Sequence, residues 1–331
     1  MIIECPHCKK KHNIDEKKIP PNAKVAQCKA CGNKFSLKLG ETISGEGPNI
    51  TTPHSVFPTP PSEGPKEPPK TFAPETEASG VRKIAISLSK GGVGKTTTAV
   101  NLAVGLAMVK KKVLLVDTDT QGQTSYMLGV QPKGGLTELV TGELAPDEAF
   151  LEARKGLFLL AGGRSLAGVK RLISRKDFGG ELTLKEALSP LESRFEYIIF
   201  DSSPGWDVLT VNVLFSADEV LIPVSLEVMT LQGLAEFLKS VAAIQKHRKG
   251  LKVTYVLPTF FDRRLKRSST ILTKLEELYG DRLCAPIRTN ARVSEAPAYG
   301  KTIYEFSPGA PGAEDYRALI RKVTGDDTLF K

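Results

Sequence analysis

A short apolar run followed by a glycine-rich loop constrains this chain more than any other feature. Residues 84–88 read Ile-Ala-Ile-Ser-Leu, and residues 90–98 read Lys-Gly-Gly-Val-Gly-Lys-Thr-Thr-Thr. The glycines let backbone N–H groups turn inward with no Cβ in the way, and a helix beginning at Lys95 adds the positive end of its dipole. The loop follows the phosphate-loop pattern G-x-x-x-x-G-K-[ST] with a tighter spacing. It predicts a strand, a polyphosphate-binding loop and a helix, in that order.

The side chains of this loop predict a nucleoside triphosphate bound together with Mg²⁺. Lys95 is expected to reach the β- and γ-phosphates, and the Thr96 hydroxyl is expected to hold the metal. A glycine-rich turn without a ligand is the alternative, but strand, loop, lysine, threonines and helix all occur in the required order. The predicted nucleotide-binding residues are Gly91, Gly92, Val93, Gly94, Lys95, Thr96 and Thr97.

A second lysine, Lys90, stands at the head of the loop. The run KGGVGKTTT resembles the deviant phosphate loop (deviant Walker A motif) of the ParA/MinD group of ATPases, in which this early lysine is the signature residue. In that family the signature lysine contacts the nucleotide bound by the partner subunit. The resemblance therefore implies that Lys90 acts across an ATP-dependent homodimer.

The strand expected at residues 112–117 ends at Asp117, and residues 117–122 read Asp-Thr-Asp-Thr-Gln-Gly. This run resembles the second motif of the same family, VDxDPQGN, with Thr120 in place of the usual proline. The resemblance implies that Asp117 lies near the water shell of the magnesium ion and that Asp119 orients the attacking water. Acidic residues that merely end a strand are the alternative.

Another buried-strand pattern, residues 195–201, ends in Asp201. It resembles a Walker B motif, in which Asp201 holds Mg²⁺ through water, and residues 202–205 resemble the switch that responds to the γ-phosphate. The resemblance thus implies an ATPase with slow basal turnover to ADP and phosphate. Its implied catalytic residues are Lys90, Lys95 and Asp119, and its implied magnesium residues are Thr96, Asp117 and Asp201.

A segment in the C-terminal part indicates which subgroup of this family the chain resembles. Residues 290–301, NARVSEAPAYGK, resemble the SEAPxxGK segment of chromosomal ParA/Soj proteins, which MinD proteins lack. In ParA/Soj proteins, arginines at the positions of Arg264 and Arg292 contact DNA without reading its sequence. A solvated charged face is the alternative for the basic run around Arg264. Family members usually carry Pro-Arg near the adenine, where this chain has Arg288 and Thr289.

Four of the five cysteines lie near the N-terminus in two Cys-x-x-Cys pairs separated by nineteen residues. This spacing is typical of zinc ribbons, in which two such knuckles complete a tetrahedral thiolate shell. Iron and disulfides are the alternatives, and disulfides are rare in the cytoplasm. His7 and His12 are expected to be bystanders, because four thiolates already fill the shell. The predicted zinc ligands are Cys5, Cys8, Cys28 and Cys31.

Composition divides the chain into three parts. Residues 1–39 hold nine lysines against three acidic residues and form the predicted zinc ribbon. Residues 40–80 hold two lysines against six acidic residues and many prolines, which predicts a flexible, disordered linker. Residues 81–331 alternate strand and helix patterns. They predict a doubly wound α/β domain with a mostly parallel sheet and the nucleotide at the C-terminal ends of its strands.

Net charge and hydropathy limit the classes of partner that we expect. The net charge of +9 favours polyanions. The chain has no apolar run of about 18 residues and no N-terminal secretory pattern, so we expect a cytoplasmic protein. MinD proteins end in a basic membrane-binding helix, whereas this chain ends near the acidic pair Asp326 and Asp327. No membrane partner is therefore expected.

The resemblance as a whole implies a ParA-type ATPase on the nucleoid. Its ATP-bound homodimer binds DNA non-specifically, and a ParB-like or other activating protein triggers hydrolysis, so that a chromosome, plasmid or other cargo is positioned or segregated. Two alternatives remain open at this point. One is a nucleotide-gated regulator that binds proteins through its ribbon and does not bind DNA. The other is an ATPase that delivers a metal or a cluster.

Overall fold

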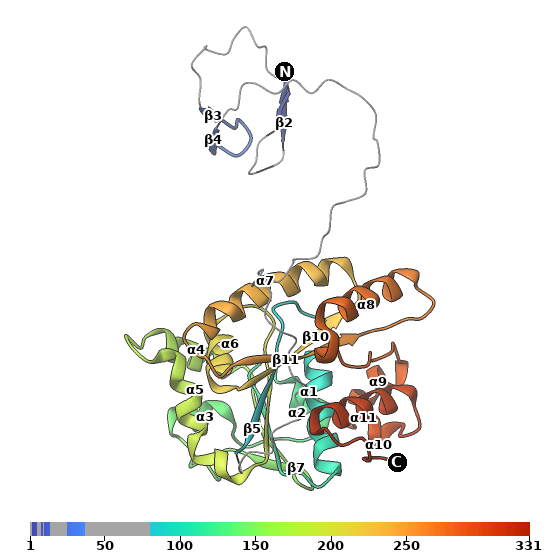
Figure 1. Cartoon of the computed structure of the whole chain (residues 1–331). Helices are drawn as coiled ribbons and strands as arrows, with labels where there is room; N and C mark the ends of the chain where they lie inside the picture. The colour runs from blue at the N-terminus through green and yellow to red at the C-terminus, as the bar shows by residue number, and fades with distance from the viewer. Residues whose placement is uncertain (1, 5–7, 9, 14–24, 37–79) are drawn as a thin grey trace. The chain divides into compact units, whose positions relative to one another are not determined.

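The chain divides into two units, Met1–His54 and Ser55–Lys331. The structure is a computed structural model (Figure 1). The residues that it describes are 2–4, 8, 10–13, 25–36 and 80–331. The linker predicted at residues 40–80 therefore lies outside the described residues, except for its last position.

The described residues of the N-terminal unit form two antiparallel hairpins. The first pairs β1 (Ile2–Glu4) with β2 (Lys11–Asn13), and the second pairs β3 (Val25–Gln27) with β4 (Lys34–Ser36). Cys28 directly follows β3, and its N–H donates to the Asn33 carbonyl at 2.9 Å. The turn passes through Gly32, whose φ of 76° suits a residue without a Cβ. The second hairpin thus carries a tight Cys-x-x-Cys turn of the kind that a zinc ribbon needs.

A seven-stranded sheet organises the second unit, in the order β11-β10-β5-β9-β6-β8-β7. Neighbouring strands are parallel except β7 and β8, which form an antiparallel pair at one edge. The predicted doubly wound, mostly parallel α/β fold is therefore confirmed. The strands are β5 (Arg82–Ile86), β6 (Val113–Asp117), β7 (Leu151–Arg154), β8 (Leu157–Leu160), β9 (Tyr197–Asp201), β10 (Glu219–Ser225) and β11 (Lys252–Thr259).

Helices cover both faces of this sheet (Figure 1). Short 3-10 turns occur at Gly180–Leu182, Ser189–Arg194, Gly280–Arg282 and Ala296–Tyr299. One face is covered by α1 (Lys95–Met108), α2 (Gln123–Leu128), α10 (Ile303–Phe306) and α11 (Pro311–Thr324). The other is covered by α3 (Leu136–Thr141), α4 (Leu166–Ser174), α5 (Thr183–Leu188), α6 (Val208–Ser216), α7 (Val228–Gln245) and α8 (Lys266–Tyr279). The short helix α9 (Ala291–Glu295) lies beside α10 and α11.

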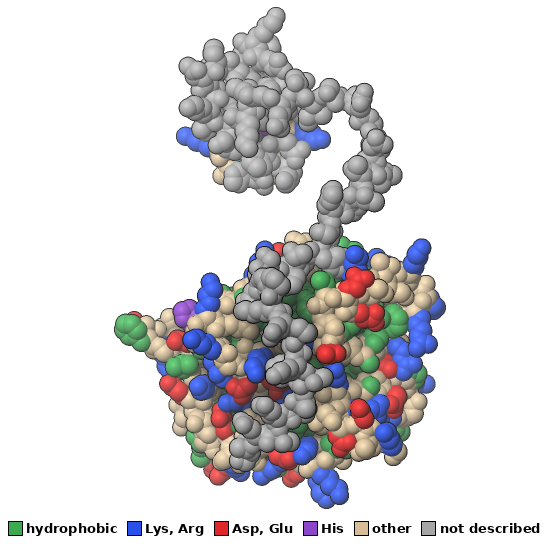
Figure 2. Space-filling view, in the orientation of Figure 1, with side chains coloured by type: hydrophobic (Ala, Val, Ile, Leu, Met, Phe, Trp, Pro, Cys, Tyr) green, Lys and Arg blue, Asp and Glu red, His purple; other side chains and the backbone are tan. Residues whose placement is uncertain are grey.

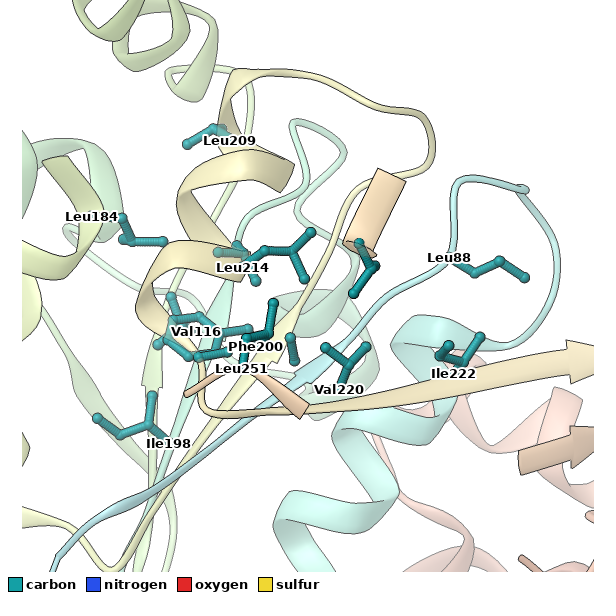
Figure 3. Packing of buried hydrophobic residues seen from close by; sticks show 14 of the residues in the cluster. Leu88, Val116, Leu184, Ile198, Phe200, Leu209, Leu214, Val220, Ile222 and Leu251 are labelled. Atoms are coloured by element: carbon teal, nitrogen blue, oxygen red, sulfur yellow. The ribbon is translucent and has the colours of Figure 1, made fainter. Parts of the chain in front are cut away.

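Burial on both faces explains why the central strands read as continuous apolar runs. In Figure 3, Leu214 of α6 lies over Val116 of β6 and Phe200 of β9, within one core cluster. On the opposite face α1 packs closely against α11, because Gly105 leaves room for the Ile320 side chain. Among the described residues, none of the helices has both the length and the apolar character needed to cross a bilayer.

Candidate nucleotide-binding site

The predicted phosphate loop joins the end of β5 to the start of α1. Lys95 is the first residue of α1, and its ammonium donates across the loop to the Lys90 carbonyl at 2.8 Å. The Lys95 side chain is buried, which lowers its pKa, whereas the charges of Asp201 and Asp119 act to raise it. Gly94 has a φ of 86°, in the left-handed region that favours glycine. The loop therefore holds a buried cation close to two carboxylates.

Two of the predicted acidic residues lie directly opposite each other in neighbouring strands. Asp117 at the end of β6 pairs in register with Asp201 at the end of β9, and both are fully buried. The oxygens of Asp117 accept hydrogen bonds from the Asp119 N–H at 2.8 Å and from the Thr124 hydroxyl at 2.6 Å. Burial nevertheless raises the pKa of Asp117 to about 6. Asp117 thus fixes the loop after β6 to α2, and Thr124 is a hydrogen-bond partner of this site that the sequence motifs did not identify.

Asp201 differs because neither of its oxygens has a hydrogen-bond partner of good geometry in the described part of the chain. Burial raises its pKa well above the ordinary value, the nearby charge of Asp117 adds to this, and the Thr96 hydroxyl and Lys95 oppose it. Three buried hydroxyls that follow the ends of β5 and β9 also lack partners among the described residues: Ser87, Ser202 and Ser203.

Buried polar groups without partners are rare in folded proteins and call for an explanation. Magnesium is bound by one or two carboxylates and keeps several water molecules. A hydrated magnesium ion beside Thr96 and Asp201 would supply hydrogen-bond donors to these groups and add positive charge to that of Lys95. The residues at the ends of β5 and β9 therefore fit the magnesium ion that the loop predicts.

Asp119 lies in the loop after β6 and is partly buried. One carboxylate oxygen accepts a hydrogen bond from the Gln121 N–H at 3.0 Å, and its carbonyl accepts one from the Gly163 N–H at 3.0 Å. The side chain is thus held near the phosphate loop, where its charge acts on Lys95.

Lys90 contacts α7 of its own chain. Its ammonium donates to the Thr230 hydroxyl at 2.7 Å and lies 3.4 Å from a carboxylate oxygen of Glu227. Thr230 is fully buried, whereas the side chains of Lys90 and Glu227 are 31% and 61% exposed. An exposed ion pair of this kind contributes little to stability, so Lys90 can exchange these contacts for others.

The two arginines expected to contact DNA emerge from segments that lie side by side. The Phe261 N–H donates to the Ile287 carbonyl, and the Thr289 N–H donates to the Phe261 carbonyl, both at 3.0 Å. Arg264 and Arg292 follow these two segments, with side chains 88% and 61% exposed.

Each of these arginines has an acidic neighbour. Arg264 pairs with Asp262 at 2.7 Å and lowers the pKa of that carboxyl to about 2. Arg292 pairs with Glu295 at 2.9 Å. Exposed pairs are weak, so a phosphate group can compete for both guanidinium groups. Lys and Arg side chains also gather at the edge of the molecule over α8 (Figure 2).

Arg288 stands where family members carry Pro-Arg near the adenine. Its guanidinium pairs with the Asp315 carboxylate of α11 at 2.6 Å and donates to the Pro311 carbonyl at 3.1 Å. Arg288 therefore holds the strand-like segment after residue 284 against α11.

In the N-terminal unit, the sulfur atoms of Cys8, Cys28 and Cys31 lie within 4.8 Å of one another. Such a set of thiolates fits zinc. Cys5, the fourth predicted ligand, lies outside the described residues. Burial raises the pKa of Cys28, but hydrogen bonds from Ala30 and other neighbours outweigh it and lower this pKa to about 5.

Comparison with known proteins identifies the family. A sequence profile described as an AAA domain matches residues 81–253, and a zinc-ribbon domain profile matches residues 1–36. The chain is 36% identical over 248 residues to the chromosome-partitioning ATPase Soj of Thermus thermophilus, covering 73% of this chain and 95% of that protein. The chain belongs to the ParA/Soj family of ATPases. The resemblance stated from the phosphate loop and the SEAPxxGK-like segment is thereby confirmed.

Two further relatives agree with the ParA/Soj assignment. The sporulation initiation inhibitor protein Soj of Bacillus subtilis is 36% identical over 254 residues, covering 73% of this chain and 98% of that protein. The chromosome partitioning protein ParA of Caulobacter vibrioides is 33% identical over 258 residues, covering 74% and 95%.

Solved structures share the fold of this ParA/Soj chain. A cobyrinic acid a,c-diamide synthase from Mycobacterium smegmatis with bound ADP and magnesium is 30% identical, with a TM-score of 0.62 over 74% of this chain and 96% of that one. An ATP complex of McdA from Cyanothece is 25% identical, with a TM-score of 0.67 over 77% of this chain and 100% of that one.

Proposed function

We propose that this ParA/Soj-family ATPase is an ATP-driven switch that positions or segregates a chromosome, plasmid or other cargo. ATP closes a homodimer, the dimer binds DNA non-specifically, and a ParB-like or other activating protein triggers slow hydrolysis that releases it. One observation carries the proposal. The β11 segment that leads to Arg264 contacts the phosphate loop directly, since the Thr259 hydroxyl donates to the Val93 carbonyl at 3.0 Å.

In this proposal the ATP site uses the residues of the phosphate loop and of three strand ends. Backbone N–H groups of residues 91–97 and the Lys95 ammonium bind the phosphates, which need positive charge and donors. Thr96, and Asp201 through water, would hold the magnesium ion, which would supply positive charge to the phosphates. Asp119 accepts a hydrogen bond from the attacking water, and Asp117 keeps the Asp119 loop in position through the 2.8 Å hydrogen bond described above.

An Asp119→Ala variant tests the hydrolytic step. We expect it to bind ATP as the wild-type protein does but to lose turnover, because Lys95 and the loop are retained while the water loses its acceptor. The variant should accumulate as an ATP-bound dimer. Phosphate release at saturating ATP measures turnover, and wild-type turnover in the variant would contradict the role given to Asp119.

We propose that the dimer forms through the edge of the sheet that carries the phosphate loop, at the C-terminal ends of the strands. The side chains exposed at this edge support the proposal. Large apolar side chains follow the C-terminal ends of β9, β10 and β11, and exposed apolar patches often mark interaction sites. Met229, beside the Lys90 contacts, is 69% exposed. The other apolar side chains exposed beyond these strand ends are Trp206, Val228, Phe260 and Leu265. We propose that Lys90 leaves Glu227 and Thr230 to contact the nucleotide of the partner subunit.

A Lys90→Ala variant tests this interface. It should bind ATP, because the phosphate contacts of Lys95 are intact. It should remain monomeric in sedimentation velocity, because the contact with the nucleotide of the partner subunit is lost. Lys249→Ala removes an exposed lysine far along the chain, beyond α7, and serves as the matched control. A normal ATP-dependent dimer from Lys90→Ala would contradict the proposed contact.

The proposed DNA surface consists of Arg264 and Arg292, with Arg263, Lys266 and Arg267 beside them. Phosphate contacts give a slope of log K against log salt of about −0.9 per contact on duplex DNA. The Arg264→Glu, Arg292→Glu double variant should bind all sequences more weakly and show a smaller slope, while its ATP turnover without DNA stays unchanged. Arg175→Glu, an exposed arginine at the end of α4, is the control. Unaltered DNA affinity in the double variant would exclude this surface.

We also propose the domain division of the chain. Residues 1–39 form a zinc-dependent docking module, residues 40–80 a flexible linker and residues 81–331 the ATPase, which acts on the nucleoid in the cytoplasm. The zinc-ribbon match and the three clustered thiols support the module. Elemental analysis of the full chain should give one zinc per chain, and Cys28→Ser should lose it. Iron found in place of zinc would contradict the proposed identity of the metal.

A further inference from the structure

One contact in the ribbon joins a predicted zinc ligand to a residue outside the set of predicted ligands. His12 belongs to β2, in the first hairpin, and its Nε2 lies 3.2 Å from the Sγ of Cys28, which follows β3 in the second hairpin. The same sulfur accepts a hydrogen bond from the Ala30 N–H at 3.4 Å. Cys28 is 2% exposed, whereas Cys8 and Cys31 are exposed. Two nitrogen atoms, one of them a backbone N–H, therefore lie within hydrogen-bonding distance of the buried sulfur of the cluster.

The positions of the ligand atoms indicate whether His12 is a metal ligand or a hydrogen-bond partner of a ligand. The ligand atoms of one tetrahedral site surround a common metal, so each must lie near all the others. The sulfurs of Cys8, Cys28 and Cys31 satisfy this within 4.8 Å, and the ring nitrogens of His12 do not join that group. His12 thus approaches Cys28 from outside the cluster.

The chemistry of a zinc thiolate fixes the direction of this hydrogen bond. A metal-bound cysteine sulfur has lost its proton and can only accept, whereas a neutral imidazole carries one N–H. Nε2 of His12 must therefore be the protonated nitrogen when the metal is bound. The expectation that His12 is a bystander overlooked this contact, because ligand counting alone does not consider residues around the ligands.

We propose that His12 is a positioning residue of the zinc shell, which donates its Nε2–H to the Cys28 thiolate and ties the first hairpin to the second. The inference rests on the proposed zinc site. The donated hydrogen bond stabilises the thiolate and fixes the Cys28 side chain before the metal binds. Partners of this kind around metal ligands typically contribute 10–100-fold to metal affinity.

Two substitutions in the full-length protein test the proposal. His12→Phe keeps a ring of similar size and removes the donor, whereas His12→Gln keeps an N–H donor. His247→Phe removes a histidine that follows α7 and is the control. Zinc affinity is measured by competition with a chromophoric chelator at constant pH. Cobalt(II) replaces zinc in a second measurement, because its visible absorption reports which atoms coordinate the metal.

We expect His12→Phe to bind zinc 10–100-fold more weakly, and His12→Gln and His247→Phe to bind it within a fewfold of wild type. The cobalt absorption bands should keep their positions in all variants that bind cobalt. Equal losses in His12→Phe and His12→Gln would overturn the donor role, as would wild-type affinity in His12→Phe. A shift of the cobalt bands would make His12 a ligand instead. Failure of the wild-type chain to bind zinc would refute the zinc site itself, which is a distinct result.

Discussion

Replacing Asp117 by asparagine should remove a large part of the pH dependence of stability of the nucleotide-free protein. Burial raises the pKa of Asp117 to about 6 from an ordinary value of 3.8. Between these two values the folded state binds a proton that the unfolded state has released. Stability therefore falls as pH rises through this window and stays low above it.

The magnitude follows from the size of the shift. About two pH units at 1.36 kcal/mol per unit give about 3 kcal/mol of stability lost between about pH 4 and pH 6. Asparagine cannot ionise, so the variant lacks this loss. Its amide oxygen can still accept from the Asp119 N–H, and its amide nitrogen can donate to the Thr124 hydroxyl. Any remaining loss of hydrogen bonding is independent of pH and cancels when the two pH profiles are compared.

Other acidic groups affect both proteins alike. Asp207 and Glu305 have lowered pKa values because of Lys170 and Arg154, although burial acts to raise both. Their contribution is lost as pH falls, and it occurs in the wild type and in the variant. Asp201 is the exception: its pKa stays raised by burial in the variant, but it loses the contribution of the Asp117 charge. A residual pH dependence of the same sign therefore remains, and the difference between the profiles reports the neighbouring carboxyls Asp117 and Asp201 together.

Urea unfolding followed by the fluorescence of Trp206 provides the assay. Trp206 is the sole tryptophan of the sequence and follows the switch after β9, so its signal reports the ATPase unit. Measurements run from pH 4 to pH 7.5 without nucleotide or magnesium, and constant m-values check that the transition remains comparable. Asp177→Asn, at an exposed position, is the control. Parallel pH profiles for the wild type and Asp117→Asn would refute the reasoning.

Three further outcomes are expected. Lys95→Ala should weaken ATP binding at least 10-fold in calorimetry, because a charge-assisted hydrogen bond contributes about 1.5–3 kcal/mol; unchanged affinity would contradict its role. Gly105→Ala should destabilise the protein by roughly 1–3 kcal/mol in urea, because the new Cβ meets Ile320; a stabilised variant would mean that helix propensity prevails. A chain that begins at Val81 should keep ATP binding and lose its zinc, and loss of ATP binding would show that the two units are not independent.

The positions of the candidate ATP-site residues in the fold could be predicted from the sequence because each part of the site is local, whereas their roles stay predictions. The loop of residues 90–98 lies between one apolar strand and one helix, and Asp117 and Asp201 each end an apolar run. Parallel strands place their C-terminal ends on the same edge of a sheet, so both carboxylates are expected at one edge. The pairing of Asp117 with Asp201 in neighbouring strands is added by the structure.

Contacts between distant parts of the chain could not be predicted in this way. Thr230 stands 140 positions after Lys90, and nothing in either local pattern links them. Asp315 stands 27 positions after Arg288, and their ion pair depends on how α11 packs. His12 and Cys28 meet because two hairpins lie together, although both residues were singled out from the sequence.

In the proposed switch, only a short segment of chain separates the phosphate loop from Arg264 of the DNA surface. The Thr259 hydroxyl holds the Val93 carbonyl of the phosphate loop, and Phe260 follows with a φ of 55°, which is unusual for a residue with a large side chain. A Cβ at Gly94 would contact the Phe260 ring at 3.8 Å, so this strained residue lies against the loop. Four positions later comes Arg264. In the proposed switch, a loop that rearranges around the γ-phosphate would act on the backbone that carries this arginine, because no helix or strand lies between Thr259 and Arg264.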